Sequence, residues 1–377
     1  MPGPLTKLLK ERAARCGTWC GGESALSFGD TAAEWAALDS GAALIDATWR
    51  RTLVATGDDR AIFLHGQTSN HVLSLESGDG CATMALNAQG KPLALLALYN
   101  DGDSMLLVSS AAEVGATRAA LERFLVADDC EFDVGPDVEA LALAGPDAAA
   151  VLRKAGIEVA DDTAARAGSG WKLSRGAIDQ QQVLVLSRGD LRVPWYELYA
   201  VDGSGNATDA ARVWNALQQA GARPCGLDAC EIVRVESGTA RFGVDIDESR
   251  IAVEGRLEWA IHFAKGCYVG QEVIERAVSR GRITHLLTLL SCTEPIPAGA
   301  HARPGAEGDV VTSSVVSPRL GPIALAYLST HSAKDATSVP PAGSDEAGTT
   351  VGFESAGRVF AASVLQWPRP RVLAGRG

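Results

Sequence analysis

The chain has 377 residues, of which 34 are basic and 46 acidic, so its formal net charge at neutral pH is −12. This balance argues against broad nonspecific binding to nucleic acid or to an anionic membrane surface. No apolar run approaches the about 20 residues that a membrane helix needs, and the N-terminus has no apolar signal core. We therefore expect a cytoplasmic protein with no membrane partner and no direct nucleic-acid partner.

The order of local patterns predicts the α+β class. A chain of this length exceeds one ordinary core, so two or three domains are expected. Helices alternate with mostly antiparallel strands rather than following a strict strand–helix–strand repeat. The expected helices cover residues 4–43, 60–64, 114–125, 209–220 and 271–277. The expected strands cover residues 43–46, 52–56, 92–99, 104–108, 182–187 and 195–199. The turn residues at 100–103 predict a hairpin between two of these strands, and the last two strands are expected to pair. Gly221 is expected to end the helix at 209–220.

One pattern occurs twice. Gly57 and Asp59 stand between a strand and a helix, and Gly145 and Asp147 stand at the same positions of a similar segment. Asp58 or Asp59 can cap the first of these helices. The pattern predicts a duplicated α+β unit. The alternative is that strand–turn–helix junctions recruit glycine and aspartate independently.

From about residue 286 the chain changes to short strand-like runs separated by glycine and proline. Such runs predict a small β-barrel. They cover residues 284–290, 309–314, 323–328 and 358–365. Residues 329–350, rich in Ser, Thr, Pro, Ala and Gly, predict an excursion between two of these strands.

The eight cysteines predict free thiols rather than a disulfide framework, because the chain is long and expected to be cytoplasmic. The closest pairs, Cys16/Cys20 and Cys225/Cys230, lack C-x-x-C spacing, and no histidines accompany them at metal-ligand spacing. We expect no dedicated metal site. Cys130 and Cys292 are expected to be more buried than Cys267.

The most distinctive stretch is Phe263-Ala264-Lys265-Gly266-Cys267-Tyr268-Val269-Gly270-Gln271-Glu272. Gly266 and Gly270 have no Cβ, so the backbone can form a tight loop or lie against a bound molecule. A helix starting near Gln271 would place the Cys267 thiol at a helix N-terminus with Lys265 close by, and both features favour thiolate. The alternative is that Cys267 is one more small buried apolar residue.

This stretch resembles the corresponding segment of the YgfZ-type tetrahydrofolate-binding proteins, which are relatives of the glycine-cleavage T protein, an aminomethyltransferase. The resemblance covers nearly the whole chain and includes residues 54–72, the turn at 86–91 and an Arg-x-Glu-x-Gly pattern at Arg234, Glu236 and Gly238. It implies two ferredoxin-like or mixed lobes and a C-terminal small β-barrel around a central folate cavity. The expected domains are residues 1–135, residues 136–283 with the cysteine stretch, and residues 284–377.

The resemblance also implies site residues. Glu197 matches the T-protein carboxylate that holds the pterin ring, and a carboxylate can accept two hydrogen bonds from an amino-pyrimidine edge. The alternative is a solvent-facing glutamate on an edge strand. Cys267 is the expected reactive thiol. The other residues implied to bind tetrahydrofolate or a one-carbon derivative are Asn87, Arg234, Lys265, Gly266, Tyr268 and Gln271.

One departure separates two branches of the family. Aminomethyltransferases carry an aspartate shortly after the glycine of the folate turn, whereas this chain continues from Gly90 with Lys91-Pro92-Leu93-Ala94-Leu95-Leu96. An apolar side chain there cannot exchange a proton or stabilise a developing cation. The departure favours the iron–sulfur branch.

We therefore expect an accessory protein of iron–sulfur cluster assembly or repair rather than an enzyme. Its implied partners are folate and iron–sulfur client proteins, including tRNA-modifying enzymes. The alternative is a folate-dependent aminomethyltransferase of the T-protein type, and a third possibility is a scaffold that no longer binds folate. The one-carbon state of the folate, the clients and the oligomeric state stay open. So does the choice between metal ligation and nucleophilic attack by Cys267.

Overall fold

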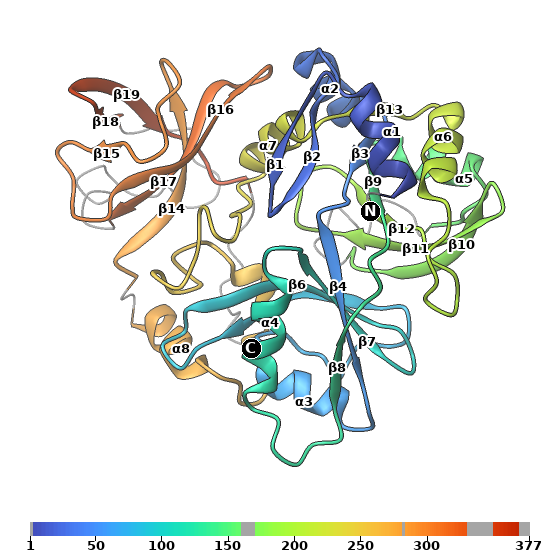
Figure 1. Ribbon diagram of the computed structural model, residues 1–377. Helices are drawn as coiled ribbons and strands as arrows, with labels where there is room; N and C mark the ends of the chain where they lie inside the picture. Colours follow the sequence, from blue (N-terminus) through green and yellow to red (C-terminus); the bar gives the residue numbers. More distant parts are fainter. Residues whose placement is uncertain (1–2, 160–169, 281–282, 330–349, 369–377) are drawn as a thin grey trace. The chain divides into compact units, whose positions relative to one another are not determined.

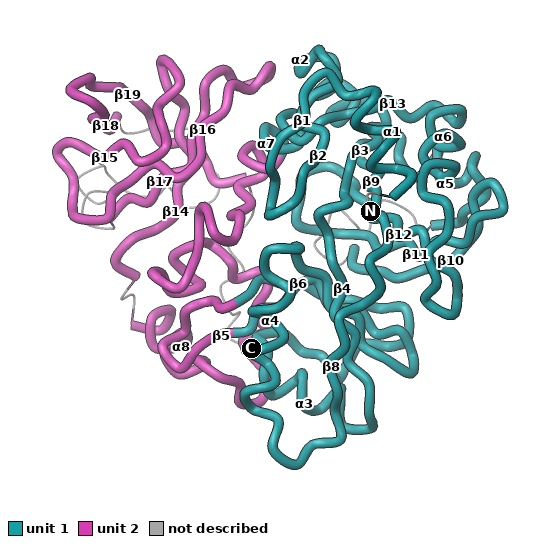
Figure 2. Tube along the Cα trace, viewed as in Figure 1, with its two compact units in different colours: residues 1–85, 94–233 teal, residues 86–93, 234–377 magenta. Residues whose placement is uncertain are grey.

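The computed structural model describes residues 3–159, 170–280, 283–329 and 350–368, which form a mixed α+β structure (Figure 1). The chain divides into two compact units (Figure 2). The first comprises Met1–Ala85 and Ala94–Val233, and the second comprises Leu86–Leu93 and Arg234–Gly377. Among the described residues, no helix is long and apolar enough to cross a membrane.

The helices are short to medium in length. They are α1 (Pro4–Arg12), α2 (Thr31–Ser40), α3 (Arg60–Gln67), α4 (Val114–Glu122), α5 (Ala148–Lys154), α6 (Ala210–Ala220), α7 (Leu227–Glu236), the 3₁₀ helix η2 (Glu258–Ala260) and α8 (Gln271–Ser279). Helix α6 begins at Asp209, whose side chain accepts from two backbone N–H groups, and ends at Gly221, with φ of 120°. The predicted stop at Gly221 is confirmed, whereas the capping role of Asp209 was not predicted.

The first unit contains a six-stranded sheet in the order β10-β11-β12-β9-β3-β13. Its strands are β3 (Ala43–Asp46), β9 (Ala140–Ala144), β10 (Leu173–Ile178), β11 (Gln181–Arg188), β12 (Trp195–Tyr199) and β13 (Arg223–Cys225). Only the β3–β13 pair is parallel. The predicted pairing of β11 with β12 is confirmed.

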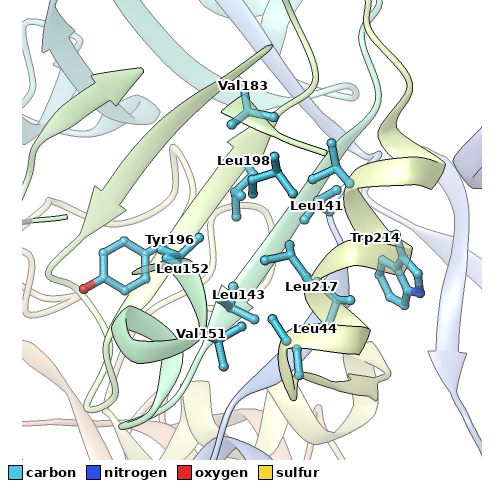
Figure 3. Close-up of a cluster of buried hydrophobic side chains, with 14 of the residues drawn as sticks. Leu44, Leu141, Leu143, Val151, Leu152, Val183, Tyr196, Leu198, Trp214 and Leu217 are labelled. Atoms are coloured by element: carbon cyan, nitrogen blue, oxygen red, sulfur yellow. The ribbon is translucent and has the colours of Figure 1, made fainter. Parts of the chain in front are cut away.

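Helices α1, α5 and α6 cover one face of this sheet and enclose a hydrophobic core (Figures 1 and 3). Strand β9 sends Leu141 and Leu143 into that core, where they meet Trp214 and Leu217 of α6. Successive side chains of a strand point to opposite faces, so the alanines of β9 lie on the other face. Glu197 pairs with Ala142 and therefore shares that second face.

A second sheet, in the order β5-β6-β7-β4-β8, lies in the same unit except for the end of β5 and the first two residues of β6, which belong to the second unit. The strands of this sheet are β4 (Arg50–Thr56), β5 (Gly80–Leu86), β6 (Pro92–Asn100), β7 (Met105–Ser110) and β8 (Glu131–Val134). The predicted hairpin around residues 100–104 is confirmed by the pairing of Asn100 with Met105.

The N-terminal segment differs from the prediction. Residues 4–43 do not form continuous helical structure, because β1 (Arg15–Trp19) and β2 (Gly22–Ser27) form a hairpin between α1 and α2. Cys20 and Gly21 in the connecting turn have φ of 46° and 84°. Two left-handed residues suit a tight hairpin turn, and the Gly21-Gly22 pair was the signal for it.

The second unit contains the closed six-stranded barrel β14-β17-β16-β15-β18-β19. The strands are β14 (His285–Cys292), β15 (His301–Ala302), β16 (Val310–Ser317), β17 (Gly321–Ser329), β18 (Thr350–Ser355) and β19 (Arg358–Val364). Phe353 and Phe360 fill its core with aliphatic side chains of the other strands. Four strands match predicted runs, and β15 and β18 were missed. Most of the predicted excursion, residues 330–349, lies outside the described residues.

The chain divides into two units, and the finer division expected from the sequence, with boundaries at residues 135 and 283, stays a prediction. Strand β3 pairs with β9, so a segment before residue 135 completes a sheet built mainly from residues after it. Residues 86–93 and 234–283 group with the barrel strands rather than with the lobes. Such long-range pairing leaves no local pattern in the sequence.

The repeated strand–turn–helix pattern has the same backbone conformation in both copies. Gly57 and Gly145 have φ of 97° and 110°, and a Cβ on either would lie within 2.4 Å of a backbone oxygen. Asp59 and Asp147 occupy the N-cap positions of α3 and α5, so the expected position of Asp59 is confirmed, but neither side chain makes a capping hydrogen bond. The Asp59 carboxylate instead accepts from the N–H of Asp129. Duplication stays a prediction.

Candidate functional site

The cysteine loop, residues 265–270, connects η2 to α8 in the second unit. Gly270 is the N-cap of α8 and has φ of 84°, a conformation that costs least for glycine. The N–H of Gln271 donates back to the carbonyl of Tyr268 at 3.2 Å. The predicted helix is confirmed, and Cys267 stands three residues before its N-cap in the chain.

Cys267 is exposed, whereas its neighbours Lys265 and Tyr268 are buried. The Lys265 ammonium lies 5.0 Å from the centroid of the Tyr268 ring, a cation–π distance. Burial, and then the charge of Glu275, raises the pKa of Tyr268 well above its ordinary value. The phenol therefore stays protonated at neutral pH. The exposure of Cys267 argues against the alternative of a buried apolar thiol.

The other cysteines behave differently. All eight are free thiols, as predicted, and Cys130 and Cys292 are buried. Burial raises the pKa of each of these two thiols to about 11. Cys267 is therefore the thiol best placed to react with a dissolved reagent. Across the residues that the structure describes, no three His, Cys, Asp or Glu side chains are grouped as a metal site would require.

The turn expected to face folate, residues 87–91, lies in the same unit as the cysteine loop. The Asn87 side-chain oxygen accepts from the backbone N–H groups of Gln89 and Lys91 at 3.0 and 3.1 Å. The carbonyl of Gly90 accepts from the N–H of Ala252 at 3.1 Å. Asn87 thus shapes the turn, and its role toward a ligand stays a prediction.

Turn and loop meet at two glycines. A Cβ on Gly270 would lie 2.5 Å from the Asn87 carbonyl oxygen and 3.1 Å from the Gly90 Cα. The structure therefore brings Asn87 together with the cysteine loop, although they are far apart in sequence. A Cβ on Gly266 would meet no atom within 4 Å, so the backbone beside Cys267 stands open to an approaching molecule.

Two expected ligand contacts have partners within the protein. The Gln271 amide donates to Glu275 at 2.6 Å. The buried Arg234 guanidinium donates to Asp245 and Ser313 at 2.6 and 2.7 Å, and also to the carbonyl of Thr239. Arg234 therefore ties the end of α7 to the barrel strand β16. A role in ligand binding stays a prediction for both residues.

The rest of the Arg-x-Glu-x-Gly pattern also makes contacts within the protein. Glu236 accepts from the hydroxyl of Ser317 at 2.5 Å and pairs with Arg319 at 3.7 Å. A Cβ on Gly238 would lie 2.8 Å from the Trp367 ring. Glu236 thus holds the end of α7 to strand β16, and the missing side chain of Gly238 leaves room for the Trp367 ring.

Glu197 lies in the first unit and is 2 % exposed. Arg50 donates to its Oε1 twice, at 2.9 and 2.6 Å, and Arg188 donates to the same atom at 2.8 Å. Tyr199 donates to Oε2 at 2.9 Å. Its burial excludes the solvent-facing alternative. Because Oε1 already accepts three hydrogen bonds, a pterin edge could donate at most one further hydrogen bond, to Oε2, while these pairs persist.

The positive and negative charges around Glu197 are equal in number. Arg188 also pairs with Asp190 at 2.5 Å, so two guanidinium groups face two carboxylates. Burial alone would raise the pKa of Glu197, but Arg50 and Arg188 hold that pKa below its usual value. Arg50 was missed because 147 residues separate it from Glu197 along the chain. Arg188 is only nine residues from Glu197 and ends the neighbouring strand β11, so the two adjacent predicted strands were a signal for this second contact. The available signal was a carboxylate in the middle of an apolar strand, which needs a buried partner.

Comparison with known proteins places the chain in a family. The family model of the GCVT N-terminal domain matches residues 5–265. The chain belongs to this family. The GCVT assignment confirms the T-protein relationship inferred from the sequence. The YgfZ-type identity within the family stays a prediction.

Curated relatives resemble the GCVT chain along most of its length. An aminomethyltransferase of Nostoc sp. is 26 % identical over 347 residues, covering 88 % of each chain. Aminomethyltransferases of Rubrobacter xylanophilus and Synechococcus sp. are 28 % and 27 % identical, covering 86 % and 97 % of each chain. The crystal structure of the glycine cleavage system aminomethyltransferase T from Bartonella henselae superposes with a TM-score of 0.79 at 23 % identity, covering 97 % of this chain and 96 % of that one. The last similarity establishes the shared fold.

Proposed function

We propose that this GCVT-family chain binds tetrahydrofolate and transfers a one-carbon or aminomethyl group in a folate-dependent reaction. The observation that carries the proposal is the contact between the 87–91 turn and the cysteine loop within one unit. Both stretches resemble folate-family segments, and they lie together. The aminomethyltransferases that resemble the chain along most of its length support the same reaction class.

The residues of this site allow a limited division of roles. The open backbone at Gly266 would let a flat ring lie against the loop. Cys267, exposed ahead of α8, would present its sulfur to the one-carbon group that a folate supplies when bound. The Glu197 ion pairs leave room for only one pterin hydrogen bond, so the expected bidentate contact does not fit the observed arrangement.

A second candidate function is support of iron–sulfur enzymes, as the YgfZ-type resemblance implied. Two observations favour it. Residues 88–96 contain no carboxylate that could handle an amine. Cys267 is an exposed thiol, and thiolates are the natural soft ligands for iron and its clusters.

One paired experiment separates the two functions. Aminomethyl-dihydrolipoyl substrate and tetrahydrofolate are supplied to the purified protein, and methylene-tetrahydrofolate is measured. Cells carrying Cys267→Ser are assayed in parallel for iron–sulfur enzyme activity, with Cys16→Ser as the control thiol. We expect folate-dependent turnover for the first function. Turnover at the blank rate would contradict it, and the second function would then require a loss of client activity in Cys267→Ser alone, at unchanged melting temperature.

A further inference from the structure

The two glycines where the turn meets the cysteine loop interlock. Gly90 and Gly270 have φ of 72° and 84°, so both adopt the left-handed conformation that disfavours other residues. A Cβ on Gly90 would lie 3.2 Å from the Ile274 Cδ1 and 3.3 Å from the Val273 Cβ, both on α8. The missing side chain of Gly90 therefore makes room for α8, and the missing side chain of Gly270 makes room for the turn.

Gly270 connects this contact to the thiol. It is the N-cap of α8, and its carbonyl accepts from the N–H of Ile274 at 3.3 Å. Cys267 lies three residues before it, on a loop whose last bond joins Tyr268 to Gln271. Because only Tyr268 and Val269 separate the two residues, a displacement of Gly270 would also displace Cys267.

The turn side of the contact is firmly held. The Asn87 side chain closes the turn through its two backbone hydrogen bonds, and the Gly90 carbonyl accepts from Ala252. A molecule that binds the turn and shifts it would push against Gly270 rather than deform the turn alone. The contact between the turn and Gly270 would therefore transmit a shift of the turn to the loop that carries Cys267.

We propose that Gly90 and Gly270 are positioning residues that set the orientation and reactivity of the Cys267 thiol according to what occupies the 87–91 turn. The identity of the occupant, a tetrahydrofolate, rests on the proposed function. The positioning role itself rests on the glycine contact.

The test is the alkylation rate of Cys267 by iodoacetamide across a range of pH, read by peptide mass spectrometry on the full chain. Gly90→Ala is compared with Gly321→Ala, since Gly321 has φ of 71° and a Cβ there would meet nothing within 4 Å. Both substitutions place alanine at a left-handed φ and so introduce similar backbone strain. Only the Cβ of Gly90→Ala contacts side chains of α8. We expect Gly90→Ala to change the rate by on the order of tenfold, as a one-unit change in thiol pKa would, and to move the pH midpoint. Gly321→Ala should match the wild type.

Asn87→Ala provides a second variant, because it loosens the turn without a clash. It should also alter the alkylation profile of Cys267 in the absence of ligand. If Gly90→Ala fails to fold, the alkylation profile of Asn87→Ala alone decides the role of the contact. An unchanged Cys267 profile in a folded Gly90→Ala protein, or in Asn87→Ala when Gly90→Ala does not fold, would overturn the proposal.

The ligand arm uses 5-formyltetrahydrofolate as the probe. Bound probe should slow alkylation of Cys267 in the wild type, and in Gly90→Ala protein saturated with probe this effect should be lost. If the probe binds the wild type but leaves the Cys267 rate unchanged, the coupling fails while the proposed function stands. If the probe does not bind at all, the proposed function fails with the ligand part of the coupling, and the ligand-free arm still decides the positioning role.

Discussion

Replacing Glu197 by glutamine is expected to destabilise the protein by about 3 kcal/mol, because it leaves two buried guanidinium groups facing one carboxylate. The side chains of Glu197, Arg50 and Arg188 are only 3 %, 11 % and 17 % exposed, so water screens the lost charge weakly. Tyr199 also loses the charged acceptor of its hydroxyl. Urea unfolding of the wild type and of Glu197→Gln measures the difference.

The same experiment has a pH signature. The folded-state pKa of Glu197 is lower than its unfolded value because Arg50 and Arg188 favour the ionised form over the opposing effect of burial. Its contribution is therefore present above the unfolded pKa, about 4.3, and is lost as pH falls through the folded value. The gap between wild type and Glu197→Gln should narrow in acid.

Glu122→Gln is the matched control. Glu122 pairs with Arg118 one helical turn away, and both side chains are about 40 % exposed. Exposed pairs of this kind contribute little to stability, because water screens the two charges. A Glu197→Gln protein as stable as Glu122→Gln would mean that the buried pairs do not form.

Replacing Arg234 by methionine is expected to cost about 3 kcal/mol in the second unit. The change leaves Asp245, whose side chain is fully buried, without its ion-pair partner. Asp245 keeps hydrogen bonds from Thr312 and Ser313, which places the loss at the lower end for broken buried pairs. Thermal and urea unfolding measure the effect.

Arg276→Met is the control for this second prediction, since Arg276 pairs with Glu272 on the exposed face of α8. It should change stability by less than about 0.5 kcal/mol. Combining Arg234→Met with Asp245→Asn should cost less than the sum of the single changes, because the second change removes the stranded charge. Full additivity would show that the two residues do not interact.

Local patterns in the sequence predicted the elements whose signals are local. The end of α6 at Gly221 and the hairpin between β6 and β7 follow from residues adjacent to those elements. The hairpin of β1 and β2 was missed because alanine-rich flanks concealed the Gly21-Gly22 turn. The place of β3 beside β9 could not be predicted, since their pairing depends on segments about a hundred residues apart.

The candidate site likewise has parts that the sequence identified and contacts that only the structure reveals. The resemblance identified the cysteine loop and the 87–91 turn, and the structure brings these two together through Gly90 and Gly270. Residue types alone could not reveal the partners of Arg234 and Glu197, because a charged side chain suited to a ligand suits an internal ion pair equally well. In the structure both side chains form buried ion pairs, and a role of either one in ligand binding stays a prediction.

Titration calorimetry of the purified protein with tetrahydrofolate, kept reduced, tests the central claim most directly. If the protein binds folate, we expect saturable heat with one ligand per chain. The affinity should be lower in Gly266→Val, because the valine side chain fills the open space beside Cys267. Gly321→Ala should bind as the wild type does. The absence of saturable heat up to about 1 mM ligand, where binding free energy falls to about −4 kcal/mol, would contradict the account.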